Sequence, residues 1–194
     1  MPTSARARTA VTSTPILDVL AQRWSPRAFD PSAVIDETKL TAALEAARWS
    51  PSASNSQPWR FIVARRGTEE FGMVEATLLG LNTAWAGSAS VLLVALTEVE
   101  DDNGKARRWA QYDLGQAMAH FTVQAYADGL HLHQMGGFDA DVLRRAFDLP
   151  SRLVPLSISA IGTLGSADSL VEPARAREVA PRERRPLAES LISG

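Results

Sequence analysis

Residues 51–61 of the chain read PSASNSQPWRF. The preceding segment, Asp36–Trp49, carries apolar residues at helical spacing behind a capping aspartate, and Arg60–Ala64 is an apolar run of strand length. A helix is therefore expected to end in a loop of small hydroxyl and amide side chains that leads into a strand. Such side chains stabilise a turn by themselves, and they can also hydrogen-bond the edge of a heterocycle.

A second informative segment lies upstream, where residues 23–29 read RWSPRAF. Arg23, Ser25 and Arg27 place two guanidiniums and a hydroxyl at alternating positions. They can form the solvated end of a helix, or they can grip a phosphate bidentately. The two segments together offer cations for a phosphate and short polar groups for a ring, which suits a planar phosphorylated cofactor. Neither contains an evident nucleophile–base pair, so we expect a bound group to carry the chemistry.

Length and composition exclude several classes of protein. A chain of 194 residues predicts one domain, residues 15–194, that buries about 70% of its unfolded surface. A net charge of −2 argues against nucleic-acid binding, and the lack of cysteine excludes disulfides, thiolate nucleophiles and iron–sulfur clusters. No apolar run reaches the ~18–20 residues of a membrane span. Residues 1–14 are basic and rich in Ser and Thr, so we expect a disordered tail and a cytoplasmic protein.

The remaining elements alternate along the chain. Further helices are predicted over Pro15–Trp24, Glu69–Leu81, Lys105–Asp128 and Asp139–Phe147, and further strands over Val91–Leu96, Leu130–Met135 and Leu156–Leu164. From Ser166 onward the apolar pattern is lost and Arg, Glu and Pro accumulate, which predicts an extended arm. Interleaved helices and strands without internal repeats predict one sheet with helices on both faces.

Other motifs carry less information. No Gly-x-Gly-x-x-Gly and no P-loop motif occurs, so a standard dinucleotide fold or P-loop lacks support. His131 and His133 share a face of a predicted strand, but further metal ligands are not nearby in the sequence. We interpret them as ordinary surface or pocket residues and predict no metal site. Gly136 and Gly137 can form a plain turn, or they can let the backbone approach a flat ring closely.

Taken in order, these segments resemble the nitroreductase family of FMN-dependent enzymes from Pro15 to Leu191. The matching stretches are RWSPRAF at 23–29, SPSASNSQPWRF at 50–61, GGFD at 136–139, and the arginine-rich end before Pro186. The resemblance implies an α+β fold of three layers, α/β/α, with a central mixed sheet and helices on both faces. It also implies a C-terminal arm, residues 166–194, that is exchanged in a homodimer.

The same resemblance implies FMN sites at the dimer interface, each built from both subunits. The cofactor-binding residues that it implies are Arg23, Trp24, Ser25, Arg27, Pro51, Ser52, Ala53, Asn55, Asn82, Gln134, Met135, Gly136, Gly137, Arg182 and Arg184.

Their implied roles differ along the cofactor. Arg23 and Ser25 would hold the phosphate and ribityl end, with help from two arginines of the tail, and Arg27 would lie near the flavin N1/O2 edge. Residues 51–55 would come from the partner chain. Asn82 would face the pyrimidine side of the ring, and residues 135–137 would line it near N5.

The chain departs from the family pattern at two positions. Trp85 stands where some members carry a lysine, and Gly136 stands where some carry a glutamate. The chain is also short between the strand at Val91 and the long helix, where larger relatives insert helices over the pocket. The substrate range therefore does not follow from the resemblance.

The implied activity is a ping-pong transfer of hydride from NADH or NADPH, through the flavin N5, to nitroaromatics, quinones or related small oxidants. No catalytic side chain is required, and Arg27 and Gly136 would tune the flavin. Three alternatives stay open: a flavin-binding protein or sensor without turnover, reductive dehalogenation on the same scaffold, and an α/β domain whose motifs are all turns and caps. The sequence does not distinguish NADH from NADPH.

Overall fold

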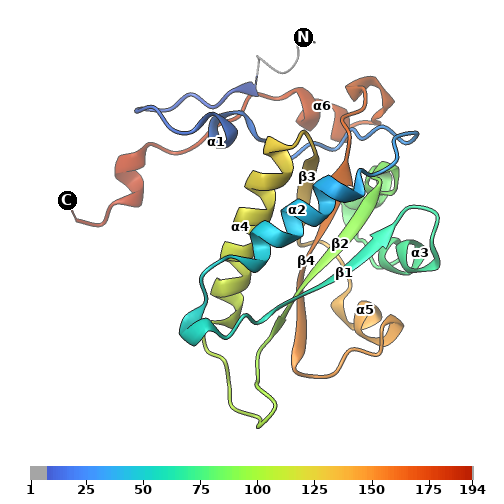
Figure 1. The fold of residues 1–194 in the computed structure, drawn as a ribbon. Coiled ribbons are helices and arrows are strands. Elements are labelled where there is room, and N and C mark those ends of the chain that lie inside the picture. Colours follow the sequence, from blue (N-terminus) through green and yellow to red (C-terminus); the bar gives the residue numbers. More distant parts are fainter. Residues whose placement is uncertain (1–7, 194) are drawn as a thin grey trace.

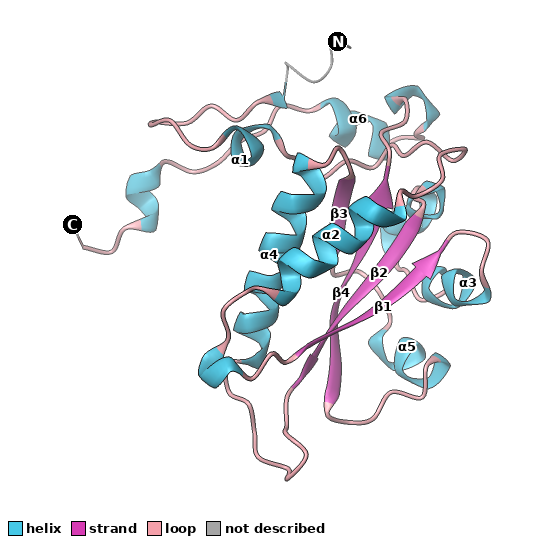
Figure 2. Cartoon of the chain, in the orientation of Figure 1, coloured by secondary structure: helices cyan, strands magenta, loops and turns pink. Residues whose placement is uncertain are grey.

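The fold has three layers, with one sheet between two pairs of helices (Figure 1). The computed structural model describes residues 8–193. Within that range four strands form the sheet in the order β1 (Trp59–Arg65), β2 (Val91–Glu98), β4 (Leu153–Gly162) and β3 (His131–Met135). One face is covered by α2 (Glu37–Arg48) and α4 (Ala110–Ala127), and the other by α3 (Glu69–Glu75) and α5 (Ala140–Ala146) (Figures 1 and 2).

Strand β2 lies inside the sheet and is buried along its whole length. Successive side chains of a strand point to opposite faces. Val91, Leu93 and Ala95 accordingly pack in the core beneath α2 and α4, and the residues between them pack beneath α3 and α5. The expected arrangement of one sheet with helices on both faces is confirmed.

The strands differ from the expected mixed sheet in one respect. All pairs among the described strands are antiparallel. Continuous apolar runs reflect burial on both faces, so they do not report strand direction. Strand β4 also begins three residues earlier than expected, because a register shift between Ala95 and Leu96 lets Pro155 lie inside the strand.

Two of the helices that cover the sheet, α3 and α4, are shorter than their sequence patterns. Helix α3 ends at Glu75, and Leu78 then pairs with Phe138 in an isolated bridge, so tertiary pairing replaces the last helical turns. Helix α4 begins at Ala110 instead of Lys105. The amide of Arg107 donates to the carbonyl of Val99 (2.7 Å), which keeps this stretch in a loop. The end of α4 agrees with the sequence, since Gly129 has φ +82° immediately beyond it.

The segment before α1 contacts the C-terminal arm, since Nη1 of Arg182 donates to the carbonyl of Arg8. Helix α1 is reduced to Asp18–Gln22 and buries no residue. Of the tail expected to be disordered, residues 1–7 lie outside the described residues. The amide of Ala10 donates to the carbonyl of Ala21 (2.8 Å).

The expectation of an unpacked arm from Ser166 onward is corrected in its first part. That segment forms α6 (Ala174–Val179), in which Ala174 and Glu178 are buried. The sequence around these two residues has no apolar periodicity, so it did not indicate that they are buried. Among residues 8–193, no helix is long and apolar enough to cross a membrane.

Candidate functional site

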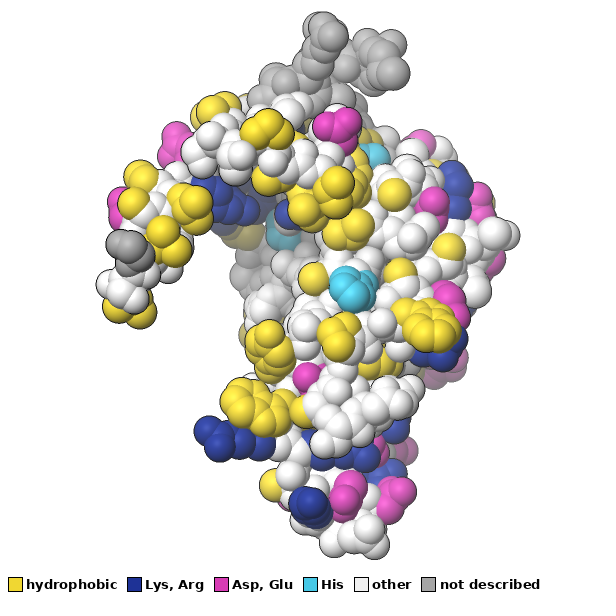
Figure 3. All heavy atoms as spheres, turned by 60° about the vertical axis from the view of Figure 1, so that its left-hand side comes forward, with side chains coloured by type: hydrophobic (Ala, Val, Ile, Leu, Met, Phe, Trp, Pro, Cys, Tyr) yellow, Lys and Arg dark blue, Asp and Glu magenta, His cyan; other side chains and the backbone are white. Residues whose placement is uncertain are grey.

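A cavity of about 210 Å³ lies between residues 23–27 and the C-terminal arm. We call it the arginine cavity, because six arginines line it together with Trp24 and Ser25: Arg8, Arg23, Arg27, Arg177, Arg182 and Arg184. Figure 3 shows basic side chains gathered beneath the projecting arm, at a hollow between the arm and the body. The four residues that the sequence predicts for the phosphate end, Arg23, Ser25, Arg182 and Arg184, therefore meet in one place.

Among the described residues that line the cavity, none has an acidic side chain. Burial lowers the pKa of Arg23, and the neighbouring Arg182 and Arg184 lower it further. Within the part of the chain described, Nε of Arg23 is buried without a hydrogen-bond partner, and its Nη2 lies 3.4 Å from Oγ of Ser25. A buried donor that lacks a partner is costly. The arrangement is therefore suited to an anion that accepts several hydrogen bonds.

The arm is held over the cavity by Arg182. Its Nη1 donates to the backbone carbonyls of Arg8 (2.9 Å) and Ala21 (2.6 Å). The guanidinium of Arg8 lies 3.8 Å from the centre of the Trp24 ring, in a cation–π contact. Arg184 is exposed and donates to the carbonyl of Glu183. Arg8 from the N-terminal segment and Arg182 from the C-terminal arm thus close the cavity.

A second cavity of about 290 Å³ adjoins the first and shares Arg23 and Ser25 with it. It is lined further by Leu20, by one side of α4, and by Leu132 and Gln134 of β3. Nε2 of Gln134 donates to Oγ1 of Thr122 (3.2 Å). The two cavities form a groove that leads from the arginines along β3.

The chain beyond β3 brings together further predicted site residues. Nδ2 of Asn82 donates to the carbonyl of Gly137 (3.2 Å), and a Cβ on Gly137 would lie only 3.0 Å from the same nitrogen. A side chain at this position would displace Asn82. The side chain of Met135 is buried in the core, so only its backbone is available to a ligand beside β3.

His133 supports the segment at 23–27. Its Nδ1 lies 2.9 Å from the carbonyl of Pro26, and its ring centre lies 4.8 Å from that of the buried Trp85. Burial, and then the nearby Arg27, lower the pKa of His133 to about 4. The neutral ring therefore donates Nδ1–H to Pro26. Among residues 8–193, no cluster of three metal-ligating side chains surrounds either strand histidine.

The lowered pKa of His133 predicts a loss of stability in mild acid. His133 takes up a proton near pH 6.5 in the unfolded chain, but only near pH 4 in the folded chain. The full contribution is therefore present above pH 6.5, and about 2–3 kcal/mol of the free energy of unfolding is lost as the pH falls to 4. Urea denaturation of His133→Asn, whose amide does not titrate, is expected to show a flatter profile across this range. An equally steep profile would assign the acid sensitivity to other groups.

The predicted ring-side loop, residues 51–57, forms a strained turn. Ser54, Asn55 and Gln57 all have φ between 46° and 54°, a region that residues other than glycine rarely adopt. The amide of Gln57 donates to Oγ of Ser52 (3.0 Å), and the amide of Ala53 donates to the buried carboxylate of Asp113 (3.1 Å). Strain held in place by such contacts is typical of functional sites.

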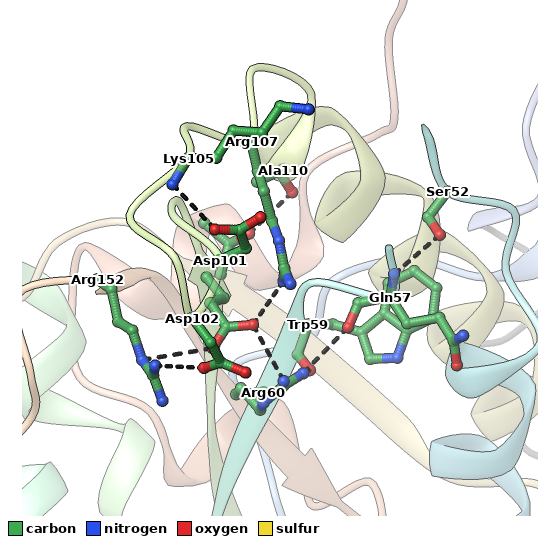
Figure 4. A network of polar contacts seen from close by, with 12 residues as sticks. Ser52, Gln57, Trp59, Arg60, Asp101, Asp102, Lys105, Arg107, Ala110 and Arg152 are labelled. Atoms are coloured by element: carbon green, nitrogen blue, oxygen red, sulfur yellow. Dashed lines mark hydrogen bonds and ion pairs between the residues drawn. The ribbon is translucent and has the colours of Figure 1, made fainter. Parts of the chain in front are cut away.

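A charged network also anchors this turn (Figure 4). Arg60 donates to the carbonyl of Gln57 (3.0 Å) and pairs with Glu98 (3.1 Å). Glu98 is buried and also pairs with Arg107 and Arg152, which come from the loop before α4 and the turn before β4. The side chains of Arg60 and Arg152 are 49% and 42% exposed, so solvent weakens their pairs with Glu98. The turn is joined to the end of the sheet by several contacts at once.

Within one chain, this turn does not line the arginine cavity or its neighbour. It contacts α4 at Asp113, whereas the second cavity contacts α4 at Thr122. Nine residues along a helix span about 14 Å and end on the opposite side of its axis. The structure thus brings the predicted phosphate-end residues together but keeps residues 51–55 apart from them.

The family model for the nitroreductase family matches residues 20–78 and 68–163, which together exceed half of the chain. The chain belongs to the nitroreductase family.

The chain is also similar to individual proteins. The chain is 46% identical to the oxygen-insensitive NAD(P)H nitroreductase of Salmonella typhimurium, over 71% of this chain and 82% of that protein. It is 33% identical to a 15.4 kDa protein of Mycolicibacterium smegmatis, over 70% of this chain and 95% of the other. A crystal structure of an oxidoreductase containing FMN superposes with a TM-score of 0.88 at 35% identity, covering 100% of this chain and 98% of that one.

Sequence reasoning missed two residues that line the arginine cavity of this nitroreductase-family chain and one that lies beside it. Arg8 falls in the segment interpreted as a tail, and Arg177 and Glu178 fall in the segment interpreted as an arm. A run of charges on an irregular segment is usually solvated, so the sequence carried no signal for them.

Proposed function

We propose that this protein is an FMN-dependent oxidoreductase that passes hydride from NADH or NADPH, through the flavin N5, to a nitroaromatic, a quinone or a related small oxidant. The observation that carries the proposal is Arg23, which lines both cavities and whose buried Nε lacks a hydrogen-bond partner among the described residues. A flavin mononucleotide has a dianionic end that fits the arginine cavity. It also has a long polar and aromatic part that fits a groove along β3.

The residues present suit this cofactor. Arg23, Ser25, Arg182 and Arg184 would hold the phosphate and ribityl end, and Arg27 would lie at the N1/O2 edge. Gln134 and the backbone at residues 135–137 would border the ring beside Asn82. Bound FMN would supply hydride acceptance and donation at N5. The chain's own residues then bind and orient the ring, and solvent can protonate the product.

A homodimer would complete the site. Residues 51–55 form a strained turn that does not line the arginine cavity or its neighbour in the same chain, and a second copy would supply these residues to the ring. We propose that Pro51, Ser52, Ala53 and Asn55 reach the flavin of the partner, and that the last part of the C-terminal arm, where the turn at Leu187–Ser190 buries no residue in its own chain, is exchanged. The cytoplasmic location stays a prediction.

The decisive experiment is an absorbance spectrum of the purified protein under nitrogen. Bound flavin is expected to absorb in the visible range, to bleach on addition of NADH or NADPH, and to recover with a quinone or a nitroaromatic. Visible absorbance that neither nucleotide bleaches would favour a flavin-binding protein or sensor. A colourless protein that cannot take up FMN would contradict the proposal.

Arg27 is expected to set the reduction potential of the flavin. Reduced flavin carries negative charge at N1/O2, and a cation there stabilises it by roughly 1.5–3 kcal/mol if one charge-assisted hydrogen bond forms. Loss of the guanidinium in Arg27→Ala should therefore lower the two-electron potential by roughly 30–60 mV. Spectroelectrochemical titration measures the potential directly. A potential equal to that of the wild type would remove Arg27 from this role.

A further inference from the structure

A buried carboxylate joins the C-terminal arm to the segment at 23–28. Glu178 of α6 is 3% exposed. Its Oε2 accepts from the amide of Arg27 (2.8 Å) and its Oε1 accepts from the amide of Ala28 (3.3 Å). The two residues it holds are about 150 positions away in the sequence, so this contact exists only in the folded protein.

Few polar contacts of the described residues join the arm to the N-terminal segment. Among residues 8–193, the hydrogen bonds that connect the chain beyond residue 173 to residues 8–28 come from two side chains, Glu178 and Arg182. Arg182 lines the cavity and is available to a ligand, whereas both carboxylate oxygens of Glu178 are engaged by backbone amides. Glu178 is thus the contact of the arm that a bound anion would not compete for.

The negative charge of Glu178 lies beside the proposed anion site. Burial lowers the pKa of Arg8 and Arg27, two arginines of the cavity, and the negative charge of Glu178 offsets part of that lowering. A carboxylate beside an anion site repels the anion, so Coulomb's law alone makes Glu178 unfavourable there. Its benefit must come from geometry. The carboxylate fixes the arm so that Arg177, Arg182 and Arg184 face Arg23 across the cavity.

We infer that Glu178 is a positioning residue that assembles the phosphate end of the cofactor site by docking the arm on residues 23–28. The inference rests on the proposed function, since the anion concerned is the phosphate of FMN.

The test compares FMN with riboflavin, which lacks the phosphate. Dissociation constants for both are measured by quenching of flavin fluorescence on titration with the apo-protein. In Glu178→Gln an amide group would face a backbone N–H, so one bond is lost although the shape is kept. The preference for FMN over riboflavin is expected to fall by about tenfold or more. Glu178→Asp keeps the charge but shortens the reach, and it is expected to show a loss of the same sign.

The alternative account predicts the opposite sign. If Glu178 acts only through its charge, Glu178→Gln raises the preference for FMN, and Glu178→Asp leaves it unchanged. Either result overturns the inference. A parallel loss of affinity for both flavins would show a general loss of folding and would also overturn it. Glu189→Gln removes an exposed carboxylate from the same arm and is expected to match the wild type.

The wild-type protein separates this inference from the proposed function. A wild type that binds FMN no better than riboflavin contradicts the phosphate site itself. A wild type that prefers FMN, with an unchanged preference in Glu178→Gln, contradicts only the role of Glu178. The melting temperature of each apo-protein, measured alongside, reports whether the variants are folded.

Discussion

Replacement of Arg23 by alanine is expected to weaken FMN binding by about two orders of magnitude, while the apo-protein keeps its stability or gains some. Arg23 is desolvated, has an unpartnered Nε among the described residues, and lies beside other guanidiniums. A guanidinium that binds phosphate bidentately contributes roughly 3 kcal/mol or more from two charge-assisted hydrogen bonds. That free energy corresponds to about a hundredfold in the dissociation constant.

The opposite effect on the apo-protein follows from the same charges. Without an anion, Arg23 is repelled by Arg182 and Arg184, and burial adds to the cost. Removing it relieves both terms. Isothermal titration with FMN and thermal unfolding of the apo-protein measure the two effects. Arg185→Ala is the matched control, because Arg185 is exposed and does not line the arginine cavity. An unchanged affinity in Arg23→Ala would refute the anion site.

A mixed dimer of two damaged subunits is expected to recover about half of its FMN sites. Arg23→Ala damages the phosphate end. Ala53→Trp adds bulk to an exposed position of the turn, so it should leave the subunit folded but block the partner's ring site. In a mixed dimer with sites built from both chains, one site receives both changes and the other receives neither. Each parental homodimer has two damaged sites.

The measurement uses two affinity tags to isolate the mixed dimer after co-expression. The ratio of flavin absorbance to protein absorbance is then compared with that of each parental dimer. A ratio about half that of the wild type supports a shared site. If each site belonged to one chain, the mixed dimer would hold no more flavin than its parents, and the composite site would have to be abandoned. A monomer on size-exclusion chromatography that still retains FMN would lead to the same conclusion.

Much of the architecture could be predicted, because it depends on residues that are close together in the sequence. The cap at Asp36, the apolar spacing of α2, the buried run of β2 and the stop at Gly129 all act within a few positions of where they stand. Local steric preferences and hydrophobic periodicity therefore indicated these elements correctly. The prediction was wrong where a residue distant in the sequence determines the local structure. Leu78, for example, pairs with Phe138 instead of extending α3.

The sequence by itself determined the order of helices and strands and the two polar segments at 23–27 and 51–57, since dihedral preference and side-chain chemistry are properties of short stretches. Only the tertiary structure decided that Arg8 and Arg177 join Arg23, that Glu178 holds the arm, and that the turn at 51–57 lies away from the arginine cavity of its own chain. Charges on irregular segments have no periodicity to reveal their partners. Their meeting depends on packing between residues more than 100 positions apart, which no local pattern encodes.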